Sequence, residues 1–372
     1  MMSGVEEYAV SLLKSMVEIY SPTGSEGELA SFLRGELAKL GFDAHVDAVG
    51  NVVATAGEGP TVLVCGHMDT VEGILPVKLV DGRLYGRGAV DAKGPLASMI
   101  VASKLYASAR PRFKVVVACV VDEEGCSRGV KHLTSTLEEP SYAFFGEPSN
   151  TVGITVGYRG SLSARLCFES RKGHVASPQL FANALELAVE AWLKVKEEAS
   201  KLARPEARFH SLDASLLELQ SPRSPGVTPF KSSALINLRL PPSIRCPDAS
   251  ALLQRCVEAS LKGREGVKGW VEVEDCVEAF GEPSTSPAVR ALQRAIIKEL
   301  GRKPLLLRKT GTSDVNVAKR RWPIPMAVYG PGDPRLDHTD EESLPIEGYL
   351  SSINVFAEAL RQLEALHYAQ RG

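Results

Sequence analysis

The stretch Thr61-Val-Leu-Val-Cys-Gly-His-Met-Asp69 is a short apolar run followed by two side chains suited to catalysis. Apolar runs of about four to eight residues are typical of strands buried on both faces of a sheet. Further runs of this kind are Phe113–Val121, Tyr142–Phe145 and Ile324–Tyr329. Stretches with helical spacing alternate with them, at Glu26–Leu40, Ala89–Ala107 and Val289–Leu300. The sequence therefore predicts an α/β domain with a mixed, mainly parallel sheet.

The pattern changes between residues 160 and 279. Ser161–Glu169 alternates polar and apolar residues, as a strand with one solvent-facing side does. A helix, a strand, a helix and a strand are predicted after it, at Ala182–Ala199, Leu235–Leu240, Ala249–Leu261 and Trp270–Val277. This order predicts a smaller two-layer α+β domain. We therefore expect a catalytic domain in two parts, 1–159 and 280–372, interrupted by an inserted domain at 160–279.

The composition of the 372 residues excludes several classes of protein. Hydrophobic residues make up 44% and charged residues 24%, as is typical of a globular protein. A formal net charge of −2 leaves no basic excess for binding nucleic acid. No apolar run approaches the roughly 20 residues that a membrane-spanning helix needs, so we expect no membrane partner.

The N-terminal segment and the cysteines indicate a cytoplasmic protein. Met1–Tyr20 contains early acidic residues and helical spacing, which favour an amphipathic helix over a secretory signal. The seven cysteines form no C-x-x-C pair, which argues against both a disulfide framework and a cysteine-type zinc finger. We therefore expect reduced thiols.

Residues that can bind metal follow each of the four apolar runs. They are His67 and Asp69, the run Asp122–Glu124, Glu147, and His338. A further carboxylate, Asp91, lies in a glycine-rich turn just before a predicted helix. The carboxyl ends of parallel strands meet at one edge of a sheet, so we expect these side chains to converge. Two histidines with several carboxylates suit zinc, and a bridging carboxylate would allow a second ion beside the first.

The adjacent pair Glu123-Glu124 is informative because neighbouring side chains on an extended loop point in different directions. One of them can coordinate a metal while the other acts as a general base towards a water molecule. Any single acid at a strand end is more often a helix cap or a solvated loop residue. The complete set of positions favours a metal centre.

Four segments resemble motifs of a known family, in the same order along the chain. They are Gly66–Thr70, Gly86–Gly94, Asp122–Gly125 and Gly146–Pro148. The family is that of the co-catalytic zinc aminoacylases, carboxypeptidase G and acetylornithine deacetylase. The resemblance implies a zinc-peptidase-like catalytic domain and an inserted lid domain through which two chains form a homodimer.

The resemblance also implies two Zn²⁺ ions, for which Co²⁺ is a possible substitute. Its metal ligands would be His67 and Glu147 for one ion, Glu124 and His338 for the other, and Asp91 as the bridge. Glu123 would be the general base and later the proton donor, and Asp69 would orient His67. His174 would reach a neighbouring subunit's site and stabilise the oxyanion, although a histidine on a surface turn is the alternative.

The strand Asn237–Pro241 resembles the family strand whose arginine contacts a substrate carboxylate, and the matching residue is Arg239. A structural ion pair is an alternative role for Arg239. Many deacylases of the family carry Asn-Val-Ile-Pro before this strand. Here the sequence is Gly226-Val-Thr-Pro229, so the asparagine is missing and the common deacetylase activity is less favoured.

Arg308–Asn316 and Tyr329–Glu341 resemble a subgroup that releases lysine or ornithine from the carrier protein LysW. The bond cleaved there is the amide to the side chain of the carrier's C-terminal glutamate. Candidate substrate contacts are Arg239, Arg308, Thr312, Ser313 and Asp314. One methylene contributes only about 1–3 kcal/mol in a pocket, so the sequence does not separate lysine from ornithine.

Other functions stay open at this point. Within the family they are N-acetylornithine deacetylase, succinyl-diaminopimelate desuccinylase, and a metallo-dipeptidase or carboxypeptidase. Outside it, the chain would be a non-catalytic binding protein on a hydrolase frame. The complete ligand set argues against that last alternative, because loss of activity usually removes a ligand or the base.

Overall fold

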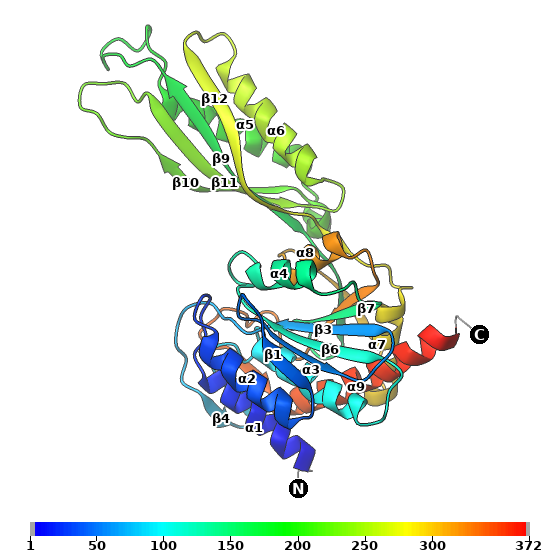
Figure 1. Cartoon of the computed structure of the whole chain (residues 1–372). Coiled ribbons are helices and arrows are strands. Elements are labelled where there is room, and N and C mark those ends of the chain that lie inside the picture. Colours follow the sequence, from blue (N-terminus) through cyan, green and yellow to red (C-terminus); the bar gives the residue numbers. More distant parts are fainter. Residues whose placement is uncertain (1–3, 370–372) are drawn as a thin grey trace. The chain divides into compact units, whose positions relative to one another are not determined.

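The computed structural model describes residues 4–369 and divides into two compact units (Figure 1). The first unit contains the described residues up to Val156, Glu282–Leu307, and the described residues from Ser313 onward. The second unit contains Gly157–Gly281 and Arg308–Thr312. The domain boundaries at 159/160 and 279/280 stay a prediction, and they lie within a few residues of these limits. No helix in the described part of the chain is long and apolar enough to cross a membrane.

The helices of the first unit are α1 (Gly4–Glu18), α2 (Gly27–Lys39), α3 (Lys93–Ala107), α4 (Arg128–Thr136), α7 (Pro287–Leu300), α8 (Asp314–Arg321) and α9 (Ile346–Ala369). Its strands are β1 (Asp43–Val46), β2 (Val52–Ala56), β3 (Thr61–His67), β4 (Lys78–Val80), β5 (Arg83–Tyr85), β6 (Lys114–Val120), β7 (Tyr142–Gly146), β15 (Met326–Tyr329) and β16 (Ser343–Pro345). Two strands cross the limits of the units, β8 (Gly153–Tyr158) and β14 (Leu305–Lys309).

The elements of the second unit are β9 (Gly160–Ser170), α5 (Ala184–Lys201), the 3₁₀ helix η1 (Pro205–His210), β10 (Asp213–Gln220), β11 (Lys231–Leu240), α6 (Cys246–Leu261), β12 (Val267–Val277) and β13 (Phe280–Gly281). The main sheet has the strand order β1-β2-β6-β3-β7-β15-β8-β13, with β14 paired to β8. Its centre, β6-β3-β7-β15, is parallel, and the flanking pairs β2-β6 and β15-β8 are antiparallel. The predicted mixed, mainly parallel sheet is confirmed.

The register of the central strands aligns their carboxyl ends. His67 of β3 lies opposite Val120 of β6, and Tyr329 of β15 lies opposite Gly146 of β7. From their second residue onward, β3 and β6 are fully buried, as expected for strands covered on both faces. The residues that follow these strands therefore meet at one edge of the sheet.

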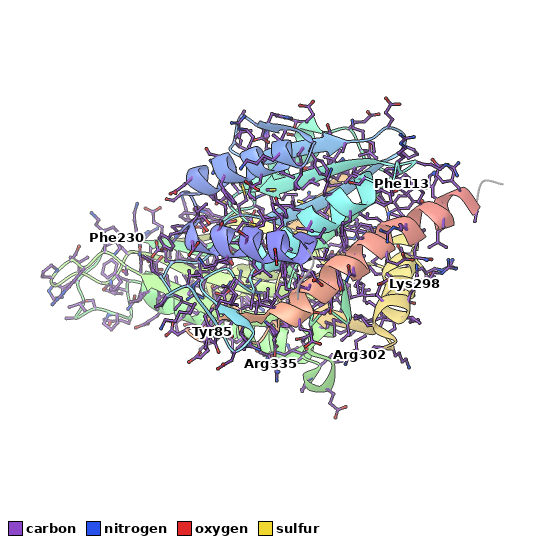
Figure 2. The ribbon with its side chains drawn as sticks, turned by 90° about the horizontal axis from the view of Figure 1, so that it is seen from below. Tyr85, Phe113, Phe230, Lys298, Arg302 and Arg335 are labelled. Carbon is purple, nitrogen blue, oxygen red and sulfur yellow. A yellow bond between two sulfur atoms is a disulfide. The ribbon has the colours of Figure 1, made fainter. Side chains whose placement is uncertain are left out.

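Helix α9 packs against both α3 and α7 beside this sheet. Figure 2 shows Lys298 on α7 next to α9, where its Nζ lies 2.7 Å from Oε1 of the buried Glu358. Most side chains on the inner face of α9 are apolar and fully buried, among them Phe356 and Leu360. Burial of such side chains holds the sheet rigid beneath the site.

The second unit has a four-stranded antiparallel sheet, β10-β11-β9-β12, packed against α5 and α6. Residues of β9 and β11 alternate between buried and half-buried, which confirms the two-layer α+β architecture. The strand β10 was missing from the sequence prediction. It is an edge strand with no fully buried residue, so its sequence shows no clear alternation of polar and apolar residues.

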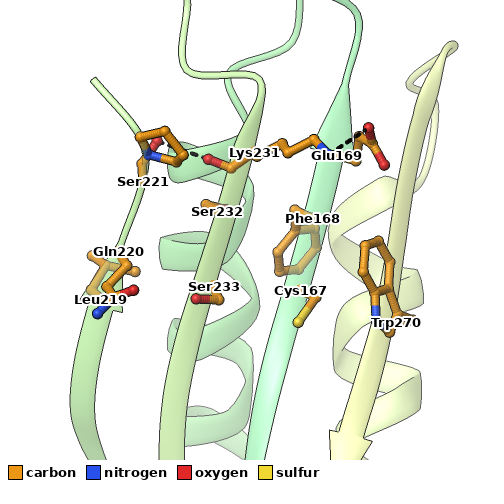
Figure 3. Close-up of a pocket in the computed structure, with 11 residues that line it drawn as sticks. Cys167, Phe168, Glu169, Leu219, Gln220, Ser221, Lys231, Ser232, Ser233 and Trp270 are labelled. Carbon is orange, nitrogen blue, oxygen red and sulfur yellow. Dashed lines mark hydrogen bonds and ion pairs between the residues drawn. The ribbon is translucent and has the colours of Figure 1, made fainter. Parts of the chain in front are cut away.

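The second sheet also carries a shallow hollow (Figure 3). In Figure 3 the helices lie behind the strands, and the hollow is lined by side chains from all four strands, including Leu219, Ser233, Cys167 and Trp270. Its lining residues differ from the predicted site residues.

The expectation of reduced thiols is wrong for two of the seven cysteines. Cys246 at the start of α6 and Cys276 near the end of β12 form a disulfide, with Cα atoms 6.1 Å apart. The two residues are 30 positions apart, and only the packing of α6 on β12 brings them together. The free cysteines are Cys65, Cys119, Cys167 and Cys256, which are buried, and Cys126, which is exposed.

Candidate metal centre

The side chains predicted as metal ligands gather at the edge of the main sheet. Asp91 lies between two imidazoles: its Oδ1 is 3.2 Å from Nε2 of His67, and its Oδ2 is 3.1 Å from Nε2 of His338. Nε2 of His338 is also 2.8 Å from Oε1 of Glu124. Single ligand atoms of His67, Asp91 and Glu124 lie within 4.8 Å of one another. A carboxylate in this position can bridge two cations.

The buried Asp69 orients both the first imidazole and the glutamate pair. Its Oδ1 and Oδ2 accept hydrogen bonds of 3.1 Å from the backbone N–H groups of Glu123 and Glu124. The hydroxyl of Thr23 donates to Oδ2 at 2.8 Å. Nδ1 of His67 donates to the carbonyl oxygen of Asp69 at 2.9 Å, which directs Nε2 towards Asp91. Such partners fix the tautomer and orientation of a metal-binding imidazole.

The two neighbouring glutamates have different surroundings. Glu124 faces His338, while Glu123 lies among other carboxylates, those of Glu147 and Asp314. Burial raises the pKa of Glu123 well above its usual value; Glu147 and Asp314 raise it further, and His67 partly offsets the rise. A carboxyl group with a raised pKa is suited to accept a proton and then return it.

Glu147 is held in place by the start of α8. The Ser313 hydroxyl donates to Oε1 of Glu147 at 2.7 Å, and both residues are buried. Ser313 also caps α8 in a reciprocal pair with Asn316. Ser313 is predicted as a substrate contact, and its bond to Glu147 is not part of that prediction. The signal for this position is that a serine just before a helix is a common cap pattern.

Asp314, also predicted as a substrate contact, is almost fully buried next to the cluster. Burial raises the pKa of Asp314 to about 7, and the charges of Asp69 and Glu147 raise it further, while a hydrogen bond from Ser127 opposes the rise. The cluster therefore contains more carboxylates than its two imidazoles can neutralise.

Glu342 is a carboxylate that the predicted site does not contain, and it follows His338 by four residues. It accepts hydrogen bonds from the backbone of Val90 and Asp91 and pairs with Arg87. No metal-ligand pattern marks it, because its partners are backbone groups and an arginine. The only signal in the sequence is its nearness to His338.

The cluster fits two divalent cations. Burial alone would lower the pKa of His67, but the carboxylates of Asp69 and Asp91 raise it well above its usual value. Those of Asp91 and Glu124 raise the pKa of His338 to about 10. The same negative charge would draw metal ions in place of these protons. Imidazole nitrogens and carboxylate oxygens form a donor set that zinc and cobalt accept.

The other predicted site residues belong to the second unit. His174 is exposed, and its Nδ1 accepts a hydrogen bond of 3.1 Å from the backbone N–H of Ala176. Nε2 then carries the proton of the neutral ring and can donate it to an oxyanion. Cζ of Arg308 lies over the ring of Phe209, 5.8 Å from the ring centre.

Arg239 on β11 has a half-buried guanidinium group. Its Nη1 is 3.4 Å from the Thr312 hydroxyl. Burial lowers the pKa of Arg239, and the charge of Arg159 lowers it further. Arg159 by contrast is paired with Asp213 at 2.7 Å. An arginine near a second positive charge is well placed to bind an anion.

Comparison with known proteins gives the family. The model of peptidase family M20/M25/M40 matches residues 63–362. A LysW-lysine hydrolase of Deinococcus radiodurans is 36% identical over 362 residues, which is 95% of this chain and 97% of that protein. A LysW-lysine/LysW-ornithine hydrolase of Sulfurisphaera tokodaii is 30% identical over 352 residues, 95% of this chain and 94% of that protein.

A solved structure shows the same fold. The aminopeptidase PepT of Bacillus cereus superposes with a TM-score of 0.79 at 20% identity, covering 96% of this chain and 98% of that chain. The chain therefore belongs to peptidase family M20/M25/M40, and the predicted metal-dependent hydrolase of amide bonds is confirmed.

Proposed function

We propose that the enzyme releases lysine, ornithine or both from the carrier protein LysW, in lysine and arginine biosynthesis. The bond cleaved is the amide to the side chain of the carrier's C-terminal glutamate. The relatives named LysW-lysine and LysW-ornithine hydrolases support this substrate, since they match nearly the whole chain. The observation that carries the proposal is Asp91 between His67 and His338, with Glu123 beside them.

The chemistry follows from the chain's own residues. Two divalent cations would be held by His67, Asp91, Glu124, Glu147 and His338. These cations would be Zn²⁺, for which Co²⁺ can substitute. When bound, they would supply Lewis acidity towards the amide carbonyl and a water molecule. Glu123 takes the proton of the attacking water and delivers it to the nitrogen of the leaving amino acid. Asp69 acts through His67 and the glutamate pair, which it orients.

The second unit supplies the substrate contacts in this proposal. His174 donates its Nε2–H to the oxyanion that forms at the scissile carbonyl. Arg239, with Arg308 and Thr312, binds a carboxylate of the substrate, and a guanidinium fork matches a carboxylate in two places. Ser313 and Asp314 complete the predicted set. Their contacts with the metal cluster support indirect roles, in which Ser313 holds Glu147 in place.

A substrate panel tests the proposal. Zinc- or cobalt-loaded enzyme is incubated with LysW conjugates of lysine and ornithine, N-acetylornithine, succinyl-diaminopimelate and simple dipeptides, and the free amino acids are quantified. We expect kcat/KM for a LysW conjugate to exceed that for the small substrates by about a hundredfold or more, since the whole carrier adds binding energy. Efficient hydrolysis of N-acetylornithine with no release from LysW would show that the substrate assignment is wrong.

Arg239→Met should raise KM by about 10- to 100-fold with little change in kcat, because a charge-assisted hydrogen bond contributes about 1.5–3 kcal/mol. Steady-state kinetics on the best substrate of the panel measure this. Arg165→Met is the matched control, since Arg165 is on the same sheet and pairs with Glu218 and Glu274. An unchanged KM in Arg239→Met would return Arg239 to a structural role.

His174→Ala should lower kcat by about a hundredfold, as expected for loss of one oxyanion donor. Metal content, measured by elemental analysis, should stay that of the wild type. His210→Ala is the control, because His210 is another exposed histidine of the second unit. A wild-type kcat in His174→Ala would identify His174 as an ordinary loop residue.

The proposal also includes a homodimer formed through the second unit and a cytoplasmic location. If His174 serves the partner's site, mixing Glu123→Gln and His174→Ala proteins restores activity, because each mixed dimer contains one intact site. Random exchange of subunits gives about a quarter of wild-type activity. No recovery on mixing, with subunit exchange verified, would place His174 in the site of its own chain.

A further inference from the structure

Two loops that carry predicted ligands are joined by a buried ion pair. Arg87 lies in the loop that leads to Asp91, and Glu342 lies in the loop that follows His338. Nη1 of Arg87 is 2.9 Å from Oε2 of Glu342, and the two side chains are only 7% and 1% exposed. An ion pair shielded in this way holds its geometry firmly, because separating it would leave a buried charge without a partner.

The second oxygen of the same carboxylate reaches the backbone of a ligand. Oε1 of Glu342 accepts hydrogen bonds from the N–H groups of Val90 at 2.9 Å and of Asp91 at 3.1 Å. Arg87 in turn donates to the carbonyl oxygens of Thr339 at 3.0 Å and Gly73 at 3.3 Å. The pair therefore binds the backbone immediately next to both Asp91 and His338.

The two imidazoles of the cluster depend on this pair to different degrees. His67 ends a central strand, its side chain is 2% exposed, and Asp69 holds its ring. The His338 side chain is 47% exposed, and its residue lies in a loop with a φ of 61°. Nothing in a strand or helix fixes His338, so its position relative to Asp91 depends on the anchoring of its loop.

We propose that Arg87 and Glu342 are a positioning pair that sets the separation of Asp91 and His338, and thereby the affinity for the second cation. This inference rests on the dinuclear centre proposed above. The affinity for the cation that His67 and Asp91 would hold depends less on the Arg87–Glu342 pair, because Asp69 and strand β3 fix the imidazole of His67. Loss of the pair should therefore weaken the two metal sites unequally.

Glu342→Gln is the sharpest variant. An amide has a single acceptor oxygen, so its NH₂ group must face either Arg87 or the backbone N–H groups of Val90 and Asp91. In either orientation two hydrogen-bond donors face each other, and one of the wild-type hydrogen-bonding contacts is lost. The shape of the side chain is kept while one half of the connection is lost. Glu341→Gln is the matched control, since Glu341 is the adjacent residue and is exposed.

Metal-free protein is titrated with Co²⁺, and binding is followed by calorimetry and by visible absorption of the bound ion. In Glu342→Gln we expect the second Co²⁺ to bind about 10- to 100-fold more weakly, the usual cost of removing a partner of a metal ligand. The first Co²⁺ should bind within about threefold of the wild-type affinity, and Glu341→Gln should match the wild type at both sites.

A second readout needs neither metal nor substrate. Amide hydrogen exchange of the metal-free protein should be about tenfold faster at Val90 and Asp91 in Glu342→Gln. The N–H groups of both residues donate to Oε1 of Glu342, and the amide of glutamine weakens or removes these hydrogen bonds. Activity at saturating Co²⁺ should return to within about threefold of the wild type, because a positioning residue acts through metal affinity.

If Glu342→Gln fails to fold, Arg87→Lys replaces it. Lysine keeps the charge but cannot reach Glu342, Thr339 and Gly73 together, so the second Co²⁺ should still bind about five- to tenfold more weakly. Equal weakening of both ions, or unchanged affinities in these variants, would overturn the inference. A wild-type protein that binds a single Co²⁺ would overturn the dinuclear centre itself, so the wild-type titration separates the two failures.

Discussion

Glu123→Gln should lower kcat by about a thousandfold or more while the protein keeps its full metal content, because a general base contributes about 10²–10⁴ to a rate. The glutamine side chain fills the same space but cannot take a proton from water. The structure supports this role, since Glu124 faces His338 whereas Glu123 lies beside Glu147 and Asp314. Stopped-flow or steady-state kinetics together with elemental analysis measure both quantities.

Glu124→Gln is the natural comparison, because it makes the same change one residue along. We expect that variant to lose metal as well as activity, since its carboxylate is 2.8 Å from His338. If Glu123→Gln loses metal while Glu124→Gln keeps it, the roles of the two glutamates are the reverse of those proposed.

Asp91→Asn should severely weaken the binding of both cations and leave no turnover above background. Each oxygen of Asp91 faces a different imidazole, and an amide offers one neutral oxygen in place of two charged ones. Without the shared charge we expect a loss of metal affinity of at least about a hundredfold, as measured by Co²⁺ titration.

The control for this variant is Asp81→Asn, because Asp81 is exposed in a turn with a φ of 49°, a conformation that asparagine adopts readily. Circular dichroism of both proteins checks whether the fold is retained. Two Co²⁺ ions bound to Asp91→Asn with wild-type affinity would refute the bridging role of Asp91.

Sequence reasoning predicted the main sheet well because its central strands are uniform apolar runs. Val62–His67 and Val115–Val120 are fully buried, so their apolar composition alone identifies them. The rule that ligands lie beyond the carboxyl ends of parallel strands then placed His67, Glu124 and His338 at one edge. This part of the site follows from local composition and one topological rule.

Other features depend on partners that a sequence pattern does not contain. β10 has an edge position and no buried residue, so its strand character comes from pairing with β11. The disulfide of Cys246 and Cys276 and the anchoring of Asp91 by Glu342 join positions that are distant in the chain. Such contacts become visible only when the backbone places the partners together.

The separation of the ligands along the chain has a consequence for biogenesis. His338 lies 214 residues after Glu124, with the whole of the second unit encoded between them. A ribosome that has made the strands β3, β6 and β7 has not yet supplied this imidazole. The nascent polypeptide can thus offer only part of the predicted metal-ligand set, and full metal loading must await synthesis of the loop that contains His338.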